Sequence, residues 1–401
     1  MITNYSKKCL KFIDKQLLID KKLPEDLWVS INLDRWTSII DNYSPDTSYR
    51  IIKKEIIPKK NDKSVPLLLQ LNKDMTEKEI KYFQSNYKIN KFKSPNANIY
   101  PKHLYKLLYE NYFISLPFQY YTETRSLQYY YLKTQQHNVH IFGYDDSNIL
   151  RFCEVLDFFG NICTPSSDCL ITILKTPFKK SMTKSKHIHP ENINSGSTVH
   201  GYGINLWRTE DVEKVLFHEL IHFNKLDFYS GYESINKFIR NKFKISGDIK
   251  PFEAFTETLA ILFHSMFISY KLNIPLKKVL KYETYFSIFQ TAKLLDMFGF
   301  NTYEDFLQTS DSNIFEWNQK TSAFCYYFLR TSFLVSLPDF LNFITPDILF
   351  ENRFDDFLIL IKHSVTNEIF INSINSYILK VKVLPDTFIK RTLKMACFQL
   401  S

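Results

Sequence analysis

The chain has 401 residues, of which 45% are hydrophobic, and a formal net charge of +9. This composition excludes a disordered chain and provides enough apolar residues for two or three cores. No stretch approaches 18 uncharged apolar residues, and the first residues lack the apolar run of a secretory signal. The sequence therefore predicts a globular, cytoplasmic protein without a membrane span or a signal peptide.

The basic residues and the cysteines give no sign of a specialised partner or compartment. The lysines are spread along the whole chain, without a recognisable nucleic-acid motif. We interpret the positive charge as a solvated surface and do not expect nucleic acid as a partner. The six cysteines are scattered and include no Cys-x-x-Cys pair, so we expect reduced thiols.

Residues 1–135 predict a helical N-terminal domain or cap. Apolar spacing favours helices at residues 10–19, 76–87 and 101–112, punctuated by Pro24, Pro58, Pro66, Pro95 and Pro101. No residue pattern in this part of the chain indicates a particular chemistry.

The pattern changes between residues 136 and 268. In chain order it predicts a strand at 138–143, a helix at 146–159, a strand at 168–175, a polar loop at 177–196, a strand at 197–207 and helices from 209 onward. This order is typical of an α+β fold, mostly helical, with a small mixed sheet. We expect a catalytic core at 136–268 and a helical C-terminal domain at 269–401.

The motif His-Glu-x-x-His, formed by His218, Glu219 and His222, lies in an apolar segment without Gly or Pro, preceded by acidic residues that favour a helix start. Residues four apart share one helix face, so the two imidazoles can converge on one ion, with zinc–nitrogen distances of about 2.0–2.1 Å. Glu219 is rotated around the helix, where it can reach a water molecule as a general base. An exposed helix carrying two polar histidines is the alternative.

A catalytic zinc ion needs a third protein ligand and an open position. Glu253 follows His222 by 31 residues and comes directly after Pro251 and Phe252, at a favourable place for a helix to begin. Glu257 lies four residues further on the same face. Two acids on so apolar a helix call for a strong positive partner, which a metal and a ligand histidine would supply. Two exposed acids on an ordinary amphipathic helix are the alternative.

The pattern His-Glu-x-x-His followed by Glu-x-x-x-Asp/Glu resembles the gluzincins, the zinc peptidases of the thermolysin and neprilysin type. The resemblance implies one Zn²⁺ held by His218, His222 and Glu253, with Glu219 as the general base that accepts a proton from the attacking water. It also implies that Glu257 fixes a ligand histidine, although the chain has Glu where the family commonly has Asp.

The resemblance covers about residues 138–265 and implies a zincin-like core acting on a peptide or protein substrate. The composition and the His-Glu-Leu-Ile-His setting are also similar to peptidase-like proteins of large DNA viruses, which implies the host cytoplasm or the virion. A metzincin would need Gly and His where Lys225 and Phe228 stand. Asp227 we interpret as a helix cap or surface acid.

In the enzymes that the chain resembles, an outer strand binds the substrate backbone. Thr198 to Leu206 is the candidate strand, in which Gly201 and Gly203 would allow close approach. A donor for the developing oxyanion is also required. Its identity stays open among His200, Tyr229, Tyr232, His264, Tyr326 and Tyr327.

The absence of a Gly-x-Met-Glu-Asn element favours an endopeptidase over an exopeptidase. Two hypotheses of other classes remain. One is a catalytically silent, structural or virion-associated protein that keeps the zincin fold, and the presence of all five predicted site residues argues against it. The other is a nucleic-acid-binding protein, which would require one contiguous basic face.

Overall fold

The computed structural model describes residues 1–17, 28, 31–45, 49–57, 101–111, 114, 116–123, 125–134, 136–163, 168–181, 187–227, 231–310, 315–344, 353–385 and 387–401. Their contacts form two compact units. We call Ser44–Lys179 with Asn194–Asn224 the sheet unit, and Met1–Tyr43, Lys180–Ile193 and Lys225–Ser401 the helical unit. The sequence predicts three domains, each able to fold independently, and this division stays a prediction. The expected helix at 76–87 lies outside the described residues.

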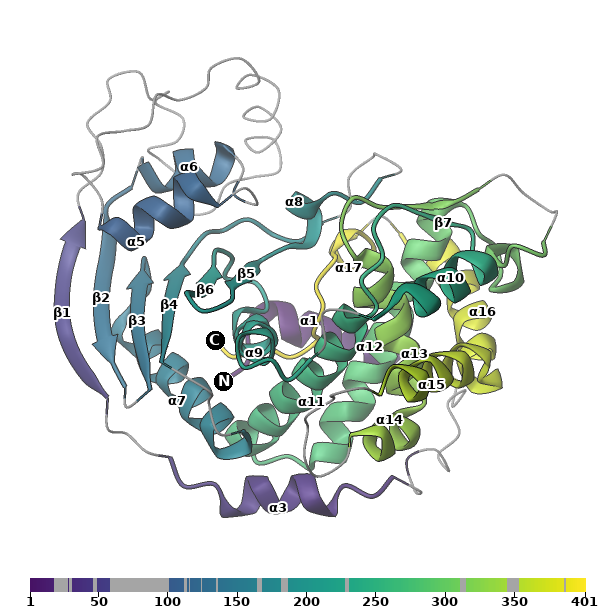
Figure 1. Cartoon of the computed structure of the whole chain (residues 1–401), viewed down its shortest axis with the longest axis horizontal. Coiled ribbons are helices and arrows are strands. Elements are labelled where there is room, and N and C mark those ends of the chain that lie inside the picture. The colour runs from purple at the N-terminus through teal and green to yellow at the C-terminus, as the bar shows by residue number, and fades with distance from the viewer. Residues whose placement is uncertain are drawn as a thin grey trace. The chain divides into compact units, whose positions relative to one another are not determined.

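The sheet unit contains a six-stranded mixed sheet in the order β1-β2-β3-β4-β6-β5 (Figure 1). The strands are β1 (Arg50–Ile57), β2 (Leu127–Lys133), β3 (His137–Phe142), β4 (Cys169–Leu174), β5 (Gly196–Val199) and β6 (Gly203–Leu206). The pairs β3–β4 and β4–β6 are parallel, whereas the other three are antiparallel. The expected α+β class with a small mixed sheet is therefore confirmed.

The two central strands, β3 and β4, are almost entirely buried because both faces of the sheet are covered. One face packs against α5 (Lys102–Tyr105), η3 (Lys106–Glu110) and α6 (Leu116–Glu123), in a core that contains Leu107, Phe142 and Leu174. On the other face lie α7 (Asp146–Ile162) and α9 (Val212–Phe223), which contact each other. The side chain of Asp145 caps α7 by accepting a hydrogen bond from the Asn148 N–H, one of the caps that the sequence favoured.

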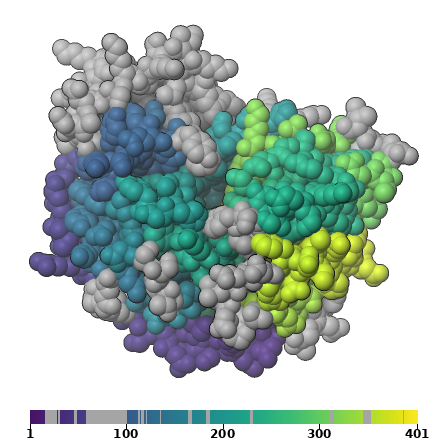
Figure 2. Space-filling model, in the orientation of Figure 1, coloured from purple at the N-terminus to yellow at the C-terminus, as the bar shows by residue number. Residues whose placement is uncertain are grey.

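Two parts of the sheet differ from the sequence expectation. Region 1–135 contains β1 and β2, so the expectation of an entirely helical region was wrong. Figure 2 shows β1 in purple at the surface of the molecule. Its residues Ile51 and Ile56 are exposed, so the strand lacks the alternation of buried apolar and exposed polar residues by which a half-buried strand is recognised in a sequence. The predicted single strand at 197–207 is a hairpin, because the chain turns at residues 200–202 and Gly201 has a left-handed φ of 71°.

A buried ion pair joins α7 to α9. The Nε atom of Arg151 lies 2.9 Å from Oε1 of Glu213, and the two side chains are 10% and 0% exposed. Burial removes both groups from water, so each depends on the other for charge compensation. This contact fixes one side of the helix that carries His-Glu-x-x-His.

We expect the substitution Arg151→Met to lower the free energy of unfolding by about 3–5 kcal/mol, because it removes the buried cation from Glu213. Urea denaturation followed by circular dichroism measures the change. The double variant Arg151→Met/Glu213→Leu is expected to recover most of the loss, because no charge then remains at this contact.

The matched control is the exposed pair Lys54–Asp146, whose charged atoms lie 3.0 Å apart with side chains 55% and 73% exposed. Water screens this pair, so Lys54→Met should cost less than about 1 kcal/mol. Equal losses for Arg151→Met and Lys54→Met would contradict the importance that we assign to the buried pair.

Two buried histidines make the stability of the sheet unit sensitive to acid. Burial lowers the pKa of His137 to about 4, against a smaller opposing effect of Asp168. Burial, followed by the neighbouring His103, lowers the pKa of His140 to about 3. Below their ordinary pKa of about 6.5, the unfolded chain binds protons that the folded chain excludes.

Stability should therefore be full above pH 6.5 and fall as the pH drops from 6.5 toward 4. From pH 7.5 to pH 5 we expect a loss of about 2–4 kcal/mol in the free energy of unfolding, measured by urea denaturation at each pH. His140→Gln should remove about half of this dependence. His363→Gln, at an exposed histidine, should leave it unchanged. An unchanged slope in His140→Gln would contradict the assignment.

The helical unit is built around two long helices, α11 (Phe252–Leu272) and α12 (Leu276–Phe298), which contact each other. Its other helical segments are α1 (Asn4–Phe12), η1 (Ile13–Leu17), α3 (Asp34–Asn42), α8 (Pro190–Ile193), α10 (Glu233–Lys242), η4 (Glu304–Phe306), η5 (Phe324–Leu329), α13 (Arg330–Val335), α14 (Leu337–Phe343), α15 (Phe354–Thr366), α16 (Glu368–Val383) and α17 (Phe388–Arg391). Two short parallel strands, β7 (Ile245–Ser246) and β8 (Trp317–Asn318), complete it.

Residues 252–269 of α11 are all buried, and the helix ends at Asn273, which has a left-handed φ of 50°. In α12, the buried carboxylate of Glu283 accepts hydrogen bonds from the backbone N–H groups of Cys397 and Phe398, so it anchors the C-terminal segment. All six cysteines lie in the described residues and are buried, free thiols. Among the helices described, none combines the length and apolar character that crossing a bilayer requires.

Candidate metal centre

The predicted motif lies in the middle of α9, a helix that is buried along its whole length. The helix follows β6 and packs against β5 and β6, which explains its apolar composition on more than one side. His218 and His222 are each 7% exposed and Glu219 is 5% exposed. The alternative of two histidines on an exposed helix is therefore excluded.

The imidazoles of His218 and His222 face each other. Their Nε2 atoms are 2.9 Å apart, and the ring planes are inclined by 84°. Two nitrogen atoms at this separation share either a proton or a cation. Two zinc–nitrogen bonds that meet at a tetrahedral angle would place the nitrogens about 3.3 Å apart, so a small opening of the pair would admit the ion.

Glu219 is held from the neighbouring strand β5. The hydroxyl of Thr198 lies 2.7 Å from Oε2 of Glu219 and donates a hydrogen bond to it. The same hydroxyl lies 3.1 Å from the Glu219 carbonyl oxygen, a second acceptor for its single proton, and the carboxylate is the nearer of the two. A fixed orientation is what a general base needs in order to accept a proton from a positioned water molecule.

Gly196, at the start of β5, leaves room for the Glu219 carboxylate. A Cβ atom at this position would stand 2.5 Å from Oε1 of Glu219 and 2.8 Å from Cγ1 of Val215. Both contacts are too close for any side chain, so glycine is required for the observed position of the carboxylate. The carboxylate is thus confined between the strand and its own helix.

Glu253 and Glu257 belong to the helical unit. Glu253 stands in the first turn of α11, two residues after Pro251, and is 9% exposed. Burial raises the pKa of the Cys325 thiol well above its usual range, and the negative charge of Glu253 adds to this effect. The alternative of two exposed acids is excluded, because Glu257 is buried as well.

Glu257 forms an ion pair with Arg330, a residue of the same helical unit. Its Oε2 atom lies 3.4 Å from Nη1 of Arg330, which also donates to the Met395 carbonyl. Arg330 is fully buried, so Glu257 compensates a charge inside the helical unit. The predicted role of Glu257 in fixing a ligand histidine stays a prediction.

The candidates for the oxyanion donor have different surroundings. His200 is exposed in the turn between β5 and β6, whereas Tyr232 precedes α10 and packs against Phe252. Tyr229 lies outside the described residues. His264 is buried within α11, and Tyr326 and Tyr327 lie in η5, where Tyr327 donates to the Leu393 carbonyl. The donor therefore stays unassigned.

Two readings of individual residues were wrong. Asp227 is no surface acid: it is buried, and its Oδ2 atom accepts a hydrogen bond of 2.8 Å from Thr256. In the expected outer strand, only β5 lies at the end of the sheet, whereas β6 pairs on both sides. Gly203 consequently allows the close approach of β6 to the Leu170 backbone of β4.

No sequence pattern indicated the roles of Thr198 and Gly196. The only available signal was Gly196 at the start of a β-branched segment, which is typical of many strands. Their contacts with Glu219 span more than 20 residues of sequence and depend on how the hairpin meets α9.

Comparison with known proteins gives one distant relative. The chain is 27% identical over 214 residues to an uncharacterised protein of Acanthamoeba polyphaga mimivirus, a match that covers 49% of this chain and 53% of that protein. The chain thus spans about half the length of this viral relative. No family model matches the chain, and no solved structure matches it.

Proposed function

We propose that this protein is a zinc-dependent peptidase with a zincin-like core. In the proposed site, His218, His222 and Glu253 hold one Zn²⁺ and Glu219 is the general base. The three ligands offer two imidazole nitrogens and one carboxylate oxygen, a donor set that can hold a metal ion and that is common at catalytic zinc sites. The choice of Glu253 rests on its spacing from the motif and on its buried place at the start of α11.

One observation carries the proposal. Two buried imidazole nitrogens face each other at 2.9 Å, one residue from a carboxylate that a strand hydroxyl holds in place. All of these groups belong to the sheet unit. A helix that served only for packing would have no need of two facing imidazoles and a buried acid, because each of these groups is costly to bury.

The bound zinc would supply a Lewis acid that polarises the substrate carbonyl and promotes loss of a proton from water. Glu219 accepts this proton as the water attacks, and later returns it to the leaving amine. Thr198 keeps the accepting carboxylate in one orientation throughout. Within the described part of the chain, no strand pairs with the outer edge of β5, and an extended substrate can form an additional strand there.

The proposal is tested by metal content and hydrolysis. The purified chain should bind one zinc ion per molecule by mass spectrometric metal analysis and should cleave peptides from a mixed library. A chelator should abolish cleavage, and added zinc should restore it. His218→Ala should hold less than about a tenth of the zinc of the wild type, because it removes one of three ligands. Equal, negligible zinc in both proteins would end the hypothesis.

The second candidate is a catalytically silent protein that keeps the fold for a structural or virion-associated role. A folded chain that binds zinc but cleaves no peptide of the library would favour it. The similarity to a mimivirus protein supports a viral setting for either candidate, with the host cytoplasm or the virion as the proposed location.

We expect Gly196→Ala to lower kcat by about 100-fold while the chain still binds zinc. The new methyl group would displace the Glu219 carboxylate, and a displacement of about 1 Å at a catalytic group costs about this factor. Steady-state kinetics and metal analysis on the same preparation measure both quantities.

The control is Gly160→Ala in α7, where the nearest atom to a new Cβ would be Oε1 of Gln136 at 3.8 Å. This variant should keep full activity and gain about 0.5–1 kcal/mol in stability, because Ala is favoured over Gly within a helix. Full activity of Gly196→Ala would show that the close contact with Glu219 does not matter for turnover.

A further inference from the structure

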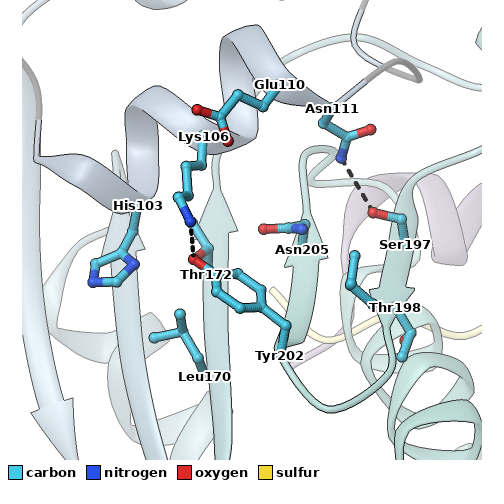
Figure 3. A pocket seen from close by; sticks show the side chains of 11 residues that line it. His103, Lys106, Glu110, Asn111, Leu170, Thr172, Ser197, Thr198, Tyr202 and Asn205 are labelled. Atoms are coloured by element: carbon cyan, nitrogen blue, oxygen red, sulfur yellow. Dashed lines mark hydrogen bonds between the residues drawn. The ribbon is translucent and has the colours of Figure 1, made fainter. Parts of the chain in front are cut away.

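A cavity of about 410 Å³, lined by several polar residues, lies beside the outer strand of the sheet unit. It opens on the face that α5 and η3 cover, and Figure 3 shows side chains from this helical segment, from β4 and from the β5–β6 hairpin pointing into it. Its volume is in the range of cavities that bind small molecules or side chains. Every lining residue belongs to the sheet unit.

The floor of the cavity is a polar row across three strands. Thr172 of β4 is in register with Asn205 of β6, which is in register with Ser197 of β5. Because side chains alternate between the two faces of a sheet, these three point to the same side. The row ends at β5, which is the last strand in the described sheet, so a residue of an added strand would continue it.

The cavity has a positioned cation. The Nζ atom of Lys106 donates a hydrogen bond of 3.0 Å to the hydroxyl of Tyr202, and it stands 4.6 Å from the centre of that ring. The hydrogen bond to Tyr202 raises the pKa of Lys106, so the ammonium group stays charged at neutral pH. Glu110 also lines the cavity, and its negative charge adds to the raised pKa of Lys106. Both charged groups are exposed to water, which screens them alike, so the amide and hydroxyl groups around Lys106 must supply the rest of the selectivity.

The remaining polar groups favour an anionic guest. Asn205 presents its amide in the middle of the cavity, and Asn111 donates a hydrogen bond of 3.1 Å to Ser197 at its edge (Figure 3). Burial lowers the pKa of His103, so this wall is neutral at pH 7. One fixed ammonium group with amide and hydroxyl donors around it matches a carboxylate.

The cavity is also linked to the proposed catalytic base. Thr198 contributes to its lining, while its hydroxyl, on the opposite face of β5 from Ser197, holds the carboxylate of Glu219. On an extended peptide added beside β5, alternate side chains would point toward α9 and toward the cavity. A residue bound in the cavity would therefore fix the register of the peptide relative to Glu219.

We propose that this cavity binds the carboxylate side chain of a Glu or Asp residue in a peptide that lies extended along β5. This inference rests on the proposed function in that it takes the ligand to be a peptide. It gives the protein a preference for acidic substrates, set by Lys106 and Asn205.

Binding is tested on the full, metal-free chain, so that the result is independent of cleavage. The probes are short alanine-based fluorescent peptides with a single Glu, each paired with its Gln counterpart, and anisotropy gives the Kd values. The Glu peptide should bind at least about tenfold more tightly than the Gln peptide, as a charge-assisted hydrogen bond predicts. Equal affinity for both peptides would overturn the inference.

Lys106→Met should remove the preference and leave the affinity for the Gln peptide unchanged. Lys102→Met, on the same helical segment but outside the cavity lining, should keep the preference. Asn205→Asp offers a second variant: it places a negative charge in the cavity and should also abolish the preference. If both Lys106→Met and Asn205→Asp still bind the Glu peptide more tightly than the Gln peptide, the Glu carboxylate binds outside this cavity and the inference is wrong.

Cleavage by the zinc-loaded chain separates the two proposals. Cleavage of Glu and Gln peptides with equal kcat/KM would overturn the inference and leave the peptidase function standing. Binding of Glu peptides that depends on Lys106, without cleavage of any peptide, would support the cavity and end the proposed catalytic function.

Discussion

Replacement of Glu219 by Gln is expected to lower kcat by about 10²–10⁴-fold while the chain keeps one zinc ion. The amide has nearly the shape of the carboxylate but cannot accept a proton from water. It can still accept the hydrogen bond from Thr198, which now lies 2.7 Å from Oε2, so the packing around α9 should be retained. Steady-state kinetics with a cleaved library peptide, together with metal analysis, measure both effects.

The control for this variant is Glu154→Gln, a partly exposed glutamate of α7 in the same unit, which should leave kcat and zinc content unchanged. A Glu219→Gln protein with wild-type kcat would rule Glu219 out as the base. Loss of zinc together with activity would show instead that Glu219 contributes to the metal site itself.

The helices and strands that the sequence predicted well are those whose residue pattern lies within a short stretch of the chain. Helix α9 and the strands β3 and β4 have a periodicity or a β-branched run that a short window contains. The hairpin β5–β6 was misread because its turn at Gly201 interrupts a segment whose apolar and β-branched residues continue on both sides. Strand β1 escaped prediction because its exposed isoleucines and lysines give no clean alternation.

The candidate site shows the same division between local and distant information. The spacing of His218 and His222 alone places the two imidazoles on one face of a helix, and they do face each other. The contact of Glu257 with Arg330 joins residues 73 positions apart, and no sequence pattern indicated it. Contacts of this kind depend on how whole elements pack, which a single sequence does not encode in any short window.

Glu257→Gln distinguishes two roles of this buried acid. If Glu257 only compensates Arg330, the free energy of unfolding should fall by about 3 kcal/mol, because the guanidinium group loses its charged partner, and zinc affinity should not change. If it also fixes a ligand histidine, as the gluzincin resemblance implies, zinc affinity should fall by about 10–100-fold. This comparison provides the reference for the corresponding change at Glu253.

Glu253→Gln should weaken zinc binding by more than about 100-fold, beyond the 10–100-fold expected for a residue that only supports a ligand. A neutral amide is a poor ligand for zinc, so only two strong protein ligands would remain where a catalytic site requires three. Competition with a chelating dye gives the zinc Kd. His218→Ala and Glu253→Gln should then have similar zinc affinities, since each leaves two ligands. An unchanged Kd in Glu253→Gln would remove Glu253 from the site and leave the two facing imidazoles of α9 without an assigned third protein ligand.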